Sequence, residues 1–405
     1  MALATLPWVL DTANRTADFL GIFNHPLSSA ELMRLARRRT GLTDFGDAGC
    51  EEPLEVLVRS YEEEADLNPF GRMAARWDMV RFLTNLLLLR DAEKRHPEIL
   101  DEPIVAPVFI TGLPRSGTTF LHRLTCEDPA NRTVLCWETI YPLAAPGVGS
   151  ALPDDRPARV DRQLAGFARL APDLASLHPI NAQSPQECTE ITGHVFRSLR
   201  FDTTHHVPSY RHWMDRAGHL EAYRFHARFL KHLQYRKGRG RWILKCPDHV
   251  FALDALREVY PDACIVFMHR DPLEVLQSVA RLTEVLRRPF TRRVDRGQIG
   301  QQVSERWGRG AAILVEAAEQ SLRSPDATFH LDFRAFTEDP AGSVAALYRR
   351  FGLTFTDDLA ARLRCAVDEQ PNGGYGRNEY RLGDYGLDAQ TERRRFRDYR
   401  EYFGL

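Results

Sequence analysis

This chain lacks the sequence features that are typical of several classes of protein. Its seven cysteines are scattered over 405 residues, with no Cys-x-x-Cys pair and no spacing typical of metal ligands. An odd number of cysteines, together with an N-terminus that has neither a basic segment nor a long apolar one, predicts reduced thiols and a cytoplasmic protein. The histidines lack the paired spacing with a Glu that zinc hydrolase helices display, so we expect no metal site.

Charge and hydropathy exclude two further classes. The formal net charge is −1 and the isoelectric point is about 6.9, so the composition offers no basic face for nucleic acid. The apolar run Leu86–Leu89 is far too short to cross a bilayer, and we expect no transmembrane segment. Hydrophobic residues make up 43% of the chain, which is enough for a sizeable core.

The pattern of apolar residues divides the chain. Residues 1–100 predict a helical N-terminal extension. From residue 101 to residue 405, apolar strands alternate with helical stretches, which predicts one α/β domain with a central parallel sheet flanked by helices. Within it, residues 143–240 predict a helical insertion. In the extension, the helical spacing is clearest over residues 30–36, 53–58 and 76–90.

A strand, a loop of small residues and a helix start follow the extension. Val105–Ile110 predicts a buried strand, and the loop after it contains Gly112 and Gly117. Loop N–H groups and a helix N-terminus together form a cradle for an anion. The spacing nearly matches the nucleoside-triphosphatase loop, but Thr118 stands in place of its Lys and Arg115 is the only cation within the loop. We therefore expect a P-loop-like fold that holds a different anion.

A second group of residues repeats the strand–helix alternation. Trp242–Leu244 and Cys264–Met268 predict buried strands, and Pro272 suits the first position of a helix. Arg270 stands at the end of the second strand, and Ser278 comes two helical turns later. A guanidinium binds phosphate with two parallel hydrogen bonds, and the hydroxyl adds another donor.

These two groups resemble the sulfotransferases that use 3′-phosphoadenosine 5′-phosphosulfate (PAPS). The segment Pro114–Thr119 resembles their 5′-phosphosulfate loop, in the form with Arg that bacterial and tyrosylprotein sulfotransferases have. Arg270 and Ser278 reproduce the spacing of the pair that holds the 3′-phosphate in that family. The resemblance implies donor contacts from the following residues: Arg115, Ser116, Gly117, Thr118, Thr119, Phe120, Arg270 and Ser278. Phe120 stands where many members have Trp beside the adenine.

The resemblance also implies catalytic residues. The segment around Glu138 is similar to one in tyrosylprotein sulfotransferases and a bacterial trehalose sulfotransferase, where a Glu is the proposed base. We expect Glu138 where a second parallel strand ends, at the carboxyl edge of the sheet. Lys245 resembles the catalytic Lys of the Lys-x-Pro segment, and with Arg115 it would stabilise the leaving oxygen. The alternative bases are Glu187 and Glu190, expected on one helix face, and His205 or His206.

The C-terminal region departs from the family pattern. The family closes over the donor with an Arg-Lys-Gly-x-x-Gly segment, which this chain lacks. Arg377 and Tyr380, with Asn378 and Arg381, are the nearest substitutes. A terminal helix is expected to carry Phe396, Tyr399 and Phe403 on one face.

The function implied is metal-independent transfer of a sulfuryl group from PAPS to a hydroxyl or amine of a small-molecule or lipid acceptor. A sulfonate carries less charge than a terminal phosphate, so protein cations and N–H groups can stabilise the transition state without Mg²⁺. Two alternatives stay open: a P-loop nucleotide kinase and a non-catalytic protein that binds adenosine bisphosphate. Peripheral membrane contact and a dimer also stay open.

Overall fold

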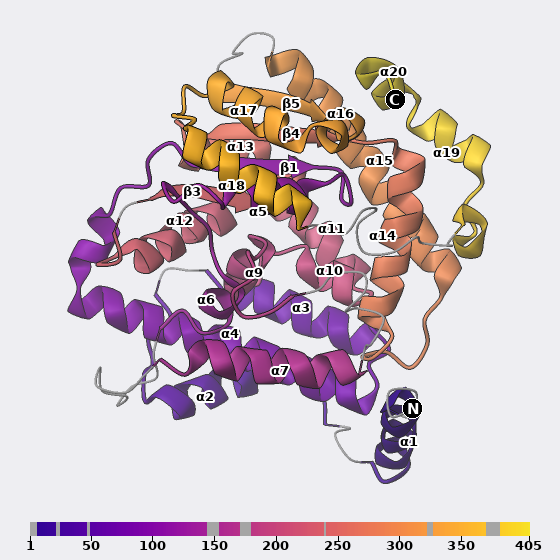
Figure 1. Ribbon diagram of the computed structural model, residues 1–405. Helices are drawn as coiled ribbons and strands as arrows, with labels where there is room; N and C mark the ends of the chain where they lie inside the picture. The colour runs from indigo at the N-terminus through magenta and orange to yellow at the C-terminus, as the bar shows by residue number, and fades with distance from the viewer. Residues whose placement is uncertain are drawn as a thin grey trace. The chain divides into compact units, whose positions relative to one another are not determined.

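Figure 1 shows the computed structural model. The chain divides into two compact units. The first unit comprises residues 1–103, 134–238 and 285–294, and the second comprises residues 104–133, 239–284 and 295–405. The first unit contains the expected extension, residues 1–100, and almost all of the expected insertion, residues 143–240. The domain boundaries stay a prediction. The residues that the structure describes are 6–21, 25–46, 49–143, 154–170, 180–238, 240–321, 327–369 and 381–405.

The second unit contains a five-stranded parallel sheet with the strand order β2-β3-β1-β4-β5. Every residue of the central strand β1 is buried, as is typical of a parallel sheet covered on both faces. The expected α/β fold is confirmed. The strands are β1 (Val108–Gly112), β2 (Asn131–Arg132), β3 (Arg241–Lys245), β4 (Cys264–His269) and β5 (Thr328–Asp332).

Strand β1 begins three residues later than the apolar run predicts. Pro107 has no N–H to donate to a neighbouring strand, and Ala106 has a left-handed backbone with φ of 41°. These two residues delay the strand until Val108. The expected strands in the second group of residues are confirmed, each within one or two residues of its predicted bounds.

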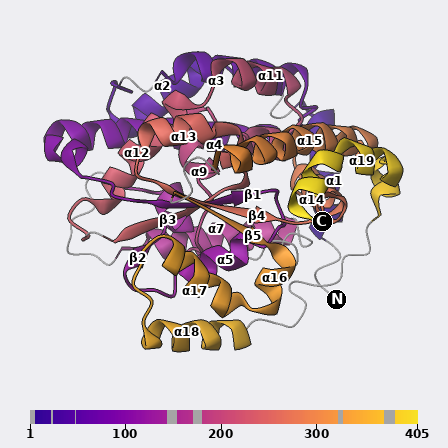
Figure 2. The same cartoon turned by 90° about the horizontal axis from the view of Figure 1, so that it is seen from above.

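Alternate residues of β1 serve the two faces of the sheet. Val108 and Ile110 join the core under α5 (Thr118–Thr125), while the ring of Phe109 packs 5.1 Å from His249 and 5.2 Å from Tyr260 on the opposite face. Figure 2 shows the sheet between these two layers. The helices on the face of Val108 also include α16 (Phe333–Glu338), α17 (Pro340–Arg350) and α18 (Asp357–Asp368). The other face carries the 3₁₀ helix η3 (Pro247–Ala252), α13 (Leu253–Val259) and α15 (Arg296–Ser321).

The first unit is built from helices. The predicted helical segments of the extension are confirmed and lie inside α2 (Ser29–Thr40), α3 (Glu51–Glu63) and α4 (Pro69–Arg95). No helix among the described residues is long and apolar enough to cross a membrane. The remaining helices are α1 (Leu6–Phe19), η1 (Pro97–Asp101), α6 (Cys136–Ile140), α7 (Arg156–Leu170), α9 (Thr189–Thr192), η2 (Gly193–Val195), α10 (Arg200–Thr204), α11 (Pro208–Ala217) and α12 (Leu220–Gln234).

Helix α14 (Pro272–Arg287) begins at the predicted proline, where Asp271 Oδ1 accepts a hydrogen bond from the N–H of Leu273 at 2.8 Å. The C-terminus contains the 3₁₀ helix η5 (Leu382–Tyr385) and two short helices, α19 (Ala389–Arg395) and α20 (Arg397–Phe403). A single terminal helix was expected, but Phe396 leaves helical geometry with φ of −100° and ψ of 15°. The helix axis therefore breaks at Phe396, whose side chain is buried.

Candidate functional site

The loop after β1 requires glycine at both ends. Gly112 has φ of 138°, and a Cβ there would lie 2.2 Å from the carbonyl oxygen of Met268 on β4. Gly117 has φ of 88°, and its Cβ would lie 3.0 Å from the ring of Phe333. Between them, the buried Ser116 donates its hydroxyl to the carbonyl oxygen of Leu113 at 2.5 Å. The loop is thus held close to β4 and leads directly into the N-terminus of α5.

Arg115 connects this loop to the two residues expected to bind the 3′-phosphate. Its Nε donates a hydrogen bond to Ser278 Oγ at 3.1 Å, and its carbonyl oxygen accepts one from Arg270 Nη1 at 2.7 Å. Arg115 itself has φ of 62°, which is uncommon outside glycine and concentrates at functional sites. The structure therefore brings Arg115 next to Arg270 and Ser278, which lie more than 150 positions further along the sequence.

Two residues that sequence reasoning missed hold the side chain of Arg270. The guanidinium lies over the ring of Phe333, with 4.1 Å from its central carbon to the ring centroid. Glu274 accepts hydrogen bonds from Nε at 3.0 Å and from Nη2 at 2.8 Å. Arg270 precedes α14 and Glu274 lies in its first turn, four residues later, and this spacing of opposite charges could have revealed the pair. No local pattern connects Phe333 with Arg270.

Lys245 is a buried cation at the end of β3. Only 2% of the residue is exposed, and the strand register places it opposite Ile110 of β1. Its Nζ donates a hydrogen bond to Thr119 Oγ1 at 3.3 Å, in the first turn of α5. A buried ammonium is costly unless polar or anionic groups surround it. The structure thus brings Lys245 to the loop, next to the buried Thr118.

Phe120 is the third residue of α5. Its ring centroid lies 5.4 Å from that of Phe336 on α16, and the side chain is only partly buried by the core there. An adenine contact by Phe120 stays a prediction. Arg377, Asn378 and Tyr380 lie outside the described residues.

Glu138 belongs to the first unit. The sequence predicts it at the end of a second parallel strand, but the structure does not place it there. Strand β2 stops at Arg132, and Glu138 is the third residue of α6. Its Oε2 accepts a hydrogen bond from the N–H of Leu135 at 3.1 Å, which caps the helix. Its Oε1 lies 3.6 Å from Lys237 Nζ, and only 6% of the side chain is exposed. The sequence contains no motif that joins Lys237 to Glu138.

The carboxylates considered as alternatives are differently placed. Glu190 lies in α9, whereas Glu187 precedes that helix, so the expectation of one shared helix face was wrong. Glu190 pairs with Arg200 at 2.8 Å and with Arg81 at 3.6 Å. These ion pairs join α9 to α4 and α10 and make a structural role the simplest account of Glu190.

His205 is a further candidate for the base, and its side chain is buried. Its Nδ1 lies 2.9 Å from Thr204 Oγ1 and 3.3 Å from Tyr61 Oη. Burial lowers the pKa of His205 to about 3. The imidazole is therefore neutral at physiological pH, and its burial among Tyr61 and Phe290 limits access to a substrate.

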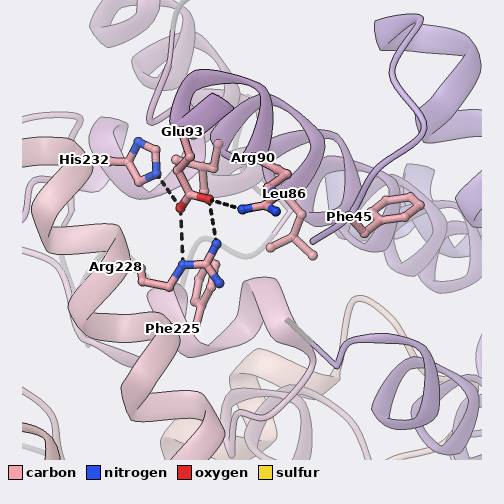
Figure 3. A pocket seen from close by; sticks show the side chains of 8 residues that line it. Phe45, Leu86, Arg90, Glu93, Phe225, Arg228 and His232 are labelled. Atoms are coloured by element: carbon pink, nitrogen blue, oxygen red, sulfur yellow. Dashed lines mark hydrogen bonds and ion pairs between the residues drawn. The ribbon is translucent and has the colours of Figure 1, made fainter. Parts of the chain in front are cut away.

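A second charged cluster, in the first unit, surrounds Glu93 (Figure 3). The carboxylate accepts hydrogen bonds from Arg228 at 2.7 Å and His232 at 3.1 Å, and it pairs with Arg90 at 3.3 Å. Burial raises the pKa of Glu93, but the hydrogen bonds from His232 and Arg228 outweigh it and lower the pKa to about 2. The hollow beside Glu93 has room for about one water molecule. This cluster therefore joins α4 to α12.

The described residues contain no group of three or more His, Cys, Asp or Glu side chains that could hold a metal ion. The groups gathered around the loop after β1 are instead cations, hydroxyls and backbone N–H groups. Such groups suit an anionic ligand.

Comparison with known proteins agrees with this arrangement. A family model described as the sulfotransferase family matches residues 107–357. The omega-hydroxy-beta-dihydromenaquinone-9 sulfotransferase Stf3 of Mycobacterium bovis and of Mycobacterium tuberculosis is 26% identical over an alignment 339 residues long, which covers 78% of this chain and 81% of the relative.

Two solved structures are similar over nearly the whole chain. Sulfotransferase STF1 from Mycobacterium tuberculosis is 32% identical with a TM-score of 0.79, and the match covers 92% of this chain and 98% of STF1. Sulfotransferase STF9 from Mycobacterium avium is 25% identical with a TM-score of 0.84, and the match covers 94% of this chain and 98% of STF9.

Proposed function

Because the chain belongs to the sulfotransferase family, we propose that it transfers a sulfuryl group from PAPS to a hydroxyl of a lipid or small-molecule acceptor. The observation that carries this proposal is the meeting of Arg115, Arg270 and Ser278 beside a glycine-bounded loop. Together they supply donors for two separate anionic groups, and PAPS carries one at its 3′ position and one at its 5′ position.

The residues present fit this donor. At Gly112 a Cβ would occupy the space next to Met268, so the loop backbone lies tightly along β4 with its N–H groups available at the start of α5. We assign the loop from Leu113 to Thr119 to the 5′ end of the donor, and Arg270 and Ser278 to its 3′-phosphate. The donor supplies an activated sulfuryl group attached to phosphate.

In this proposal Lys245 stabilises the negative charge that develops on the 5′-phosphate oxygen. Its ammonium is held on Thr119, inside the first turn of α5, where burial excludes water. A fixed cation in such a place stabilises developing charge more strongly than one in bulk water, because it needs no reorganisation. Arg115 would share this role from the loop.

Glu138 is our candidate for the base that takes the proton of the acceptor hydroxyl. One carboxylate oxygen is occupied by the N–H of Leu135, while the other lies near Lys237 and is the one we assign to the proton. The neighbouring ammonium would stabilise the carboxylate between turnovers. The assignment rests on resemblance to the family segment and on the burial of Glu138.

A hydroxylated lipid is the acceptor class that we favour. The relative Stf3 is named for an omega-hydroxylated dihydromenaquinone. In this chain, we expect residues 1–100 and the helical insertion of residues 143–240 to build the acceptor pocket, and both are rich in Leu, Phe, Trp and Tyr. We also propose that the reaction needs no metal ion and takes place in the cytoplasm.

The test is transfer of radiolabelled sulfate from PAPS to a panel of hydroxylated isoprenoid quinones, sterols and sugars. We expect a labelled lipid product together with release of adenosine 3′,5′-bisphosphate. Arg115→Ala should abolish both. Transfer of phosphate from ATP to any acceptor, with none from PAPS, would contradict the proposal and favour the kinase alternative.

A further inference from the structure

The C-terminal helix α20 packs against the end of β4, directly before Arg270. The ring of His269, the last residue of β4, stacks on Phe403 with 3.6 Å between centroids and 19° between ring planes. Tyr399 Oη lies 3.1 Å from His269 Nδ1, and both residues are 2% exposed. Residues near the end of the chain therefore contact the strand end that leads into the residue assigned to the 3′-phosphate.

The contact continues beyond His269. Its second ring nitrogen, Nε2, lies 2.9 Å from Nδ1 of His330 on β5, within hydrogen-bond distance. Tyr399, His269 and His330 thus form one continuous chain of hydrogen bonds that ties α20 to β4 and β5.

Both imidazoles in this chain of hydrogen bonds are held in the neutral form. Burial lowers the pKa of His269 well below its usual value, and the neighbouring His330 lowers it further. Burial also lowers the pKa of His330. A second link joins the same elements, because Arg400 Nε lies 3.4 Å from a carboxylate oxygen of Asp271.

We propose that Tyr399 is a positioning residue of the donor site, which through His269 fixes the end of β4 so that the guanidinium of Arg270, the next residue, is held for the 3′-phosphate. This inference rests on the proposed function. The guanidinium is constrained at its outer end by Arg115 and Phe333, and the contacts of His269 with Tyr399 and Phe403 constrain the backbone directly before it. A cation held at both ends binds an anion with little loss of conformational freedom.

The experiment compares two ligands in the full-length protein. Tyr399→Phe removes one oxygen and keeps the ring, so it leaves Nδ1 of His269 without its partner. We expect the Kd for adenosine 3′,5′-bisphosphate to rise by about fivefold to tenfold. The Kd for adenosine 5′-monophosphate, which has no 3′-phosphate, should change by less than about twofold, because Arg270 is assigned to the 3′ position.

Kinetics provide a second measurement on the same variant. The KM for PAPS should rise in parallel with the Kd for the bisphosphate, while kcat at saturating PAPS stays within about twofold of the original. The matched control is Tyr402→Phe on the same helix, at a residue that is 41% exposed against 2% for Tyr399, and it should change neither value. If Tyr399→Phe folds poorly, Phe403→Leu removes the stacking on His269 and should weaken bisphosphate binding in the same selective way.

The outcomes separate this inference from the proposed function. Equal weakening of both ligands by Tyr399→Phe, or no weakening of either, would overturn the positioning role. If Arg270→Ala leaves bisphosphate affinity unchanged, the donor site itself is wrongly assigned. A loss in Arg270→Ala without one in Tyr399→Phe contradicts only the inference about α20.

Discussion

Lys245 Nζ donates a hydrogen bond to Thr119 Oγ1 across 3.3 Å and so joins the end of β3 to the first turn of α5. The loop after β1 has no lysine of its own, since Thr118 occupies the position at which nucleoside triphosphatases have Lys. The structure supplies an ammonium to the same helix turn from a neighbouring strand. A cation is thus present at the loop, although it comes from a different part of the chain.

The first prediction concerns this lysine. Lys245→Met keeps the length and much of the volume of the side chain but removes its charge. We expect kcat to fall by roughly 10²–10³, the range seen when one stabilising group for developing charge is removed. Stopped reactions with radiolabelled PAPS would measure it. Lys94→Met, at a side chain that is 53% exposed in the first unit, is the control and should have normal activity.

The second prediction concerns the competition between Glu274 and phosphate for Arg270. Arg270→Ala should weaken binding of adenosine 3′,5′-bisphosphate by roughly 2–5 kcal/mol, as expected when a charged partner is removed. Glu274→Gln should instead tighten binding by up to about fivefold, because an exposed ion pair contributes only about 0.2–1 kcal/mol and Arg270 is released from it. Isothermal titration calorimetry measures both. Weaker binding in Glu274→Gln would show that the carboxylate orients Arg270 and does not compete.

Local patterns were sufficient to predict most of the sheet and part of the site. Strands buried on both faces appear in the sequence as continuous apolar runs, such as Cys264–Met268. Arg270 and Ser278 could be placed because they are only eight positions apart, at the end of β4 and in the helix that follows it. Proline at position 272 identified the helix start for a similarly local reason.

Contacts between distant segments could not be predicted in the same way. Phe333 supports Arg270 from 63 positions further along the chain, and Tyr399 contacts His269, the residue before Arg270, from 130 positions further. Neither contact leaves a periodic or spacing signal, because tertiary packing alone creates it. The position of Glu138 was missed for another reason: β2 is only two residues long, so the expected strand end lies well before it.

The third prediction concerns stability in acid. Burial lowers the pKa of His205 to about 3 from 6.5. Below pH 6.5 the unfolded chain binds a proton at this residue while the folded chain does not, so stability falls as the pH drops from 6.5 to 3. His205→Phe should remove about 1.4 kcal/mol per pH unit from this slope. Urea unfolding at pH 7, 6 and 5 measures the slope, and an unchanged slope would contradict the assigned burial of the neutral imidazole.

The fourth prediction concerns metal ions. The charges around the loop come from Arg115, Arg270 and Lys245, so sulfuryl transfer should continue at more than half its rate in excess EDTA. The control is the same assay with added Mg²⁺, which should change the rate little. Complete loss of turnover in EDTA that Mg²⁺ restores would favour a kinase-like mechanism.

The last prediction tests the base. Glu138→Gln keeps the shape of the side chain, but an amide cannot accept the proton of the acceptor. We expect kcat to fall by roughly 10²–10⁴ while the Kd for PAPS stays within about twofold. We expect kcat to fall less in Lys237→Met, because this change removes only the ammonium group near Glu138 and keeps the carboxylate.

Parallel variants decide between Glu138 and the other candidates. Glu187→Gln should retain near-normal turnover, and Glu190→Gln should lower stability before it lowers kcat, because Glu190 is bound by Arg200 and Arg81. Single-turnover rates at saturating PAPS separate the chemical step from binding. If Glu138→Gln turns over normally while Glu190→Gln or His205→Phe abolishes the chemical step, the base lies in residues 187–205. The acceptor hydroxyl would then have to approach that segment, and the assignment of Glu138 as the base would be wrong.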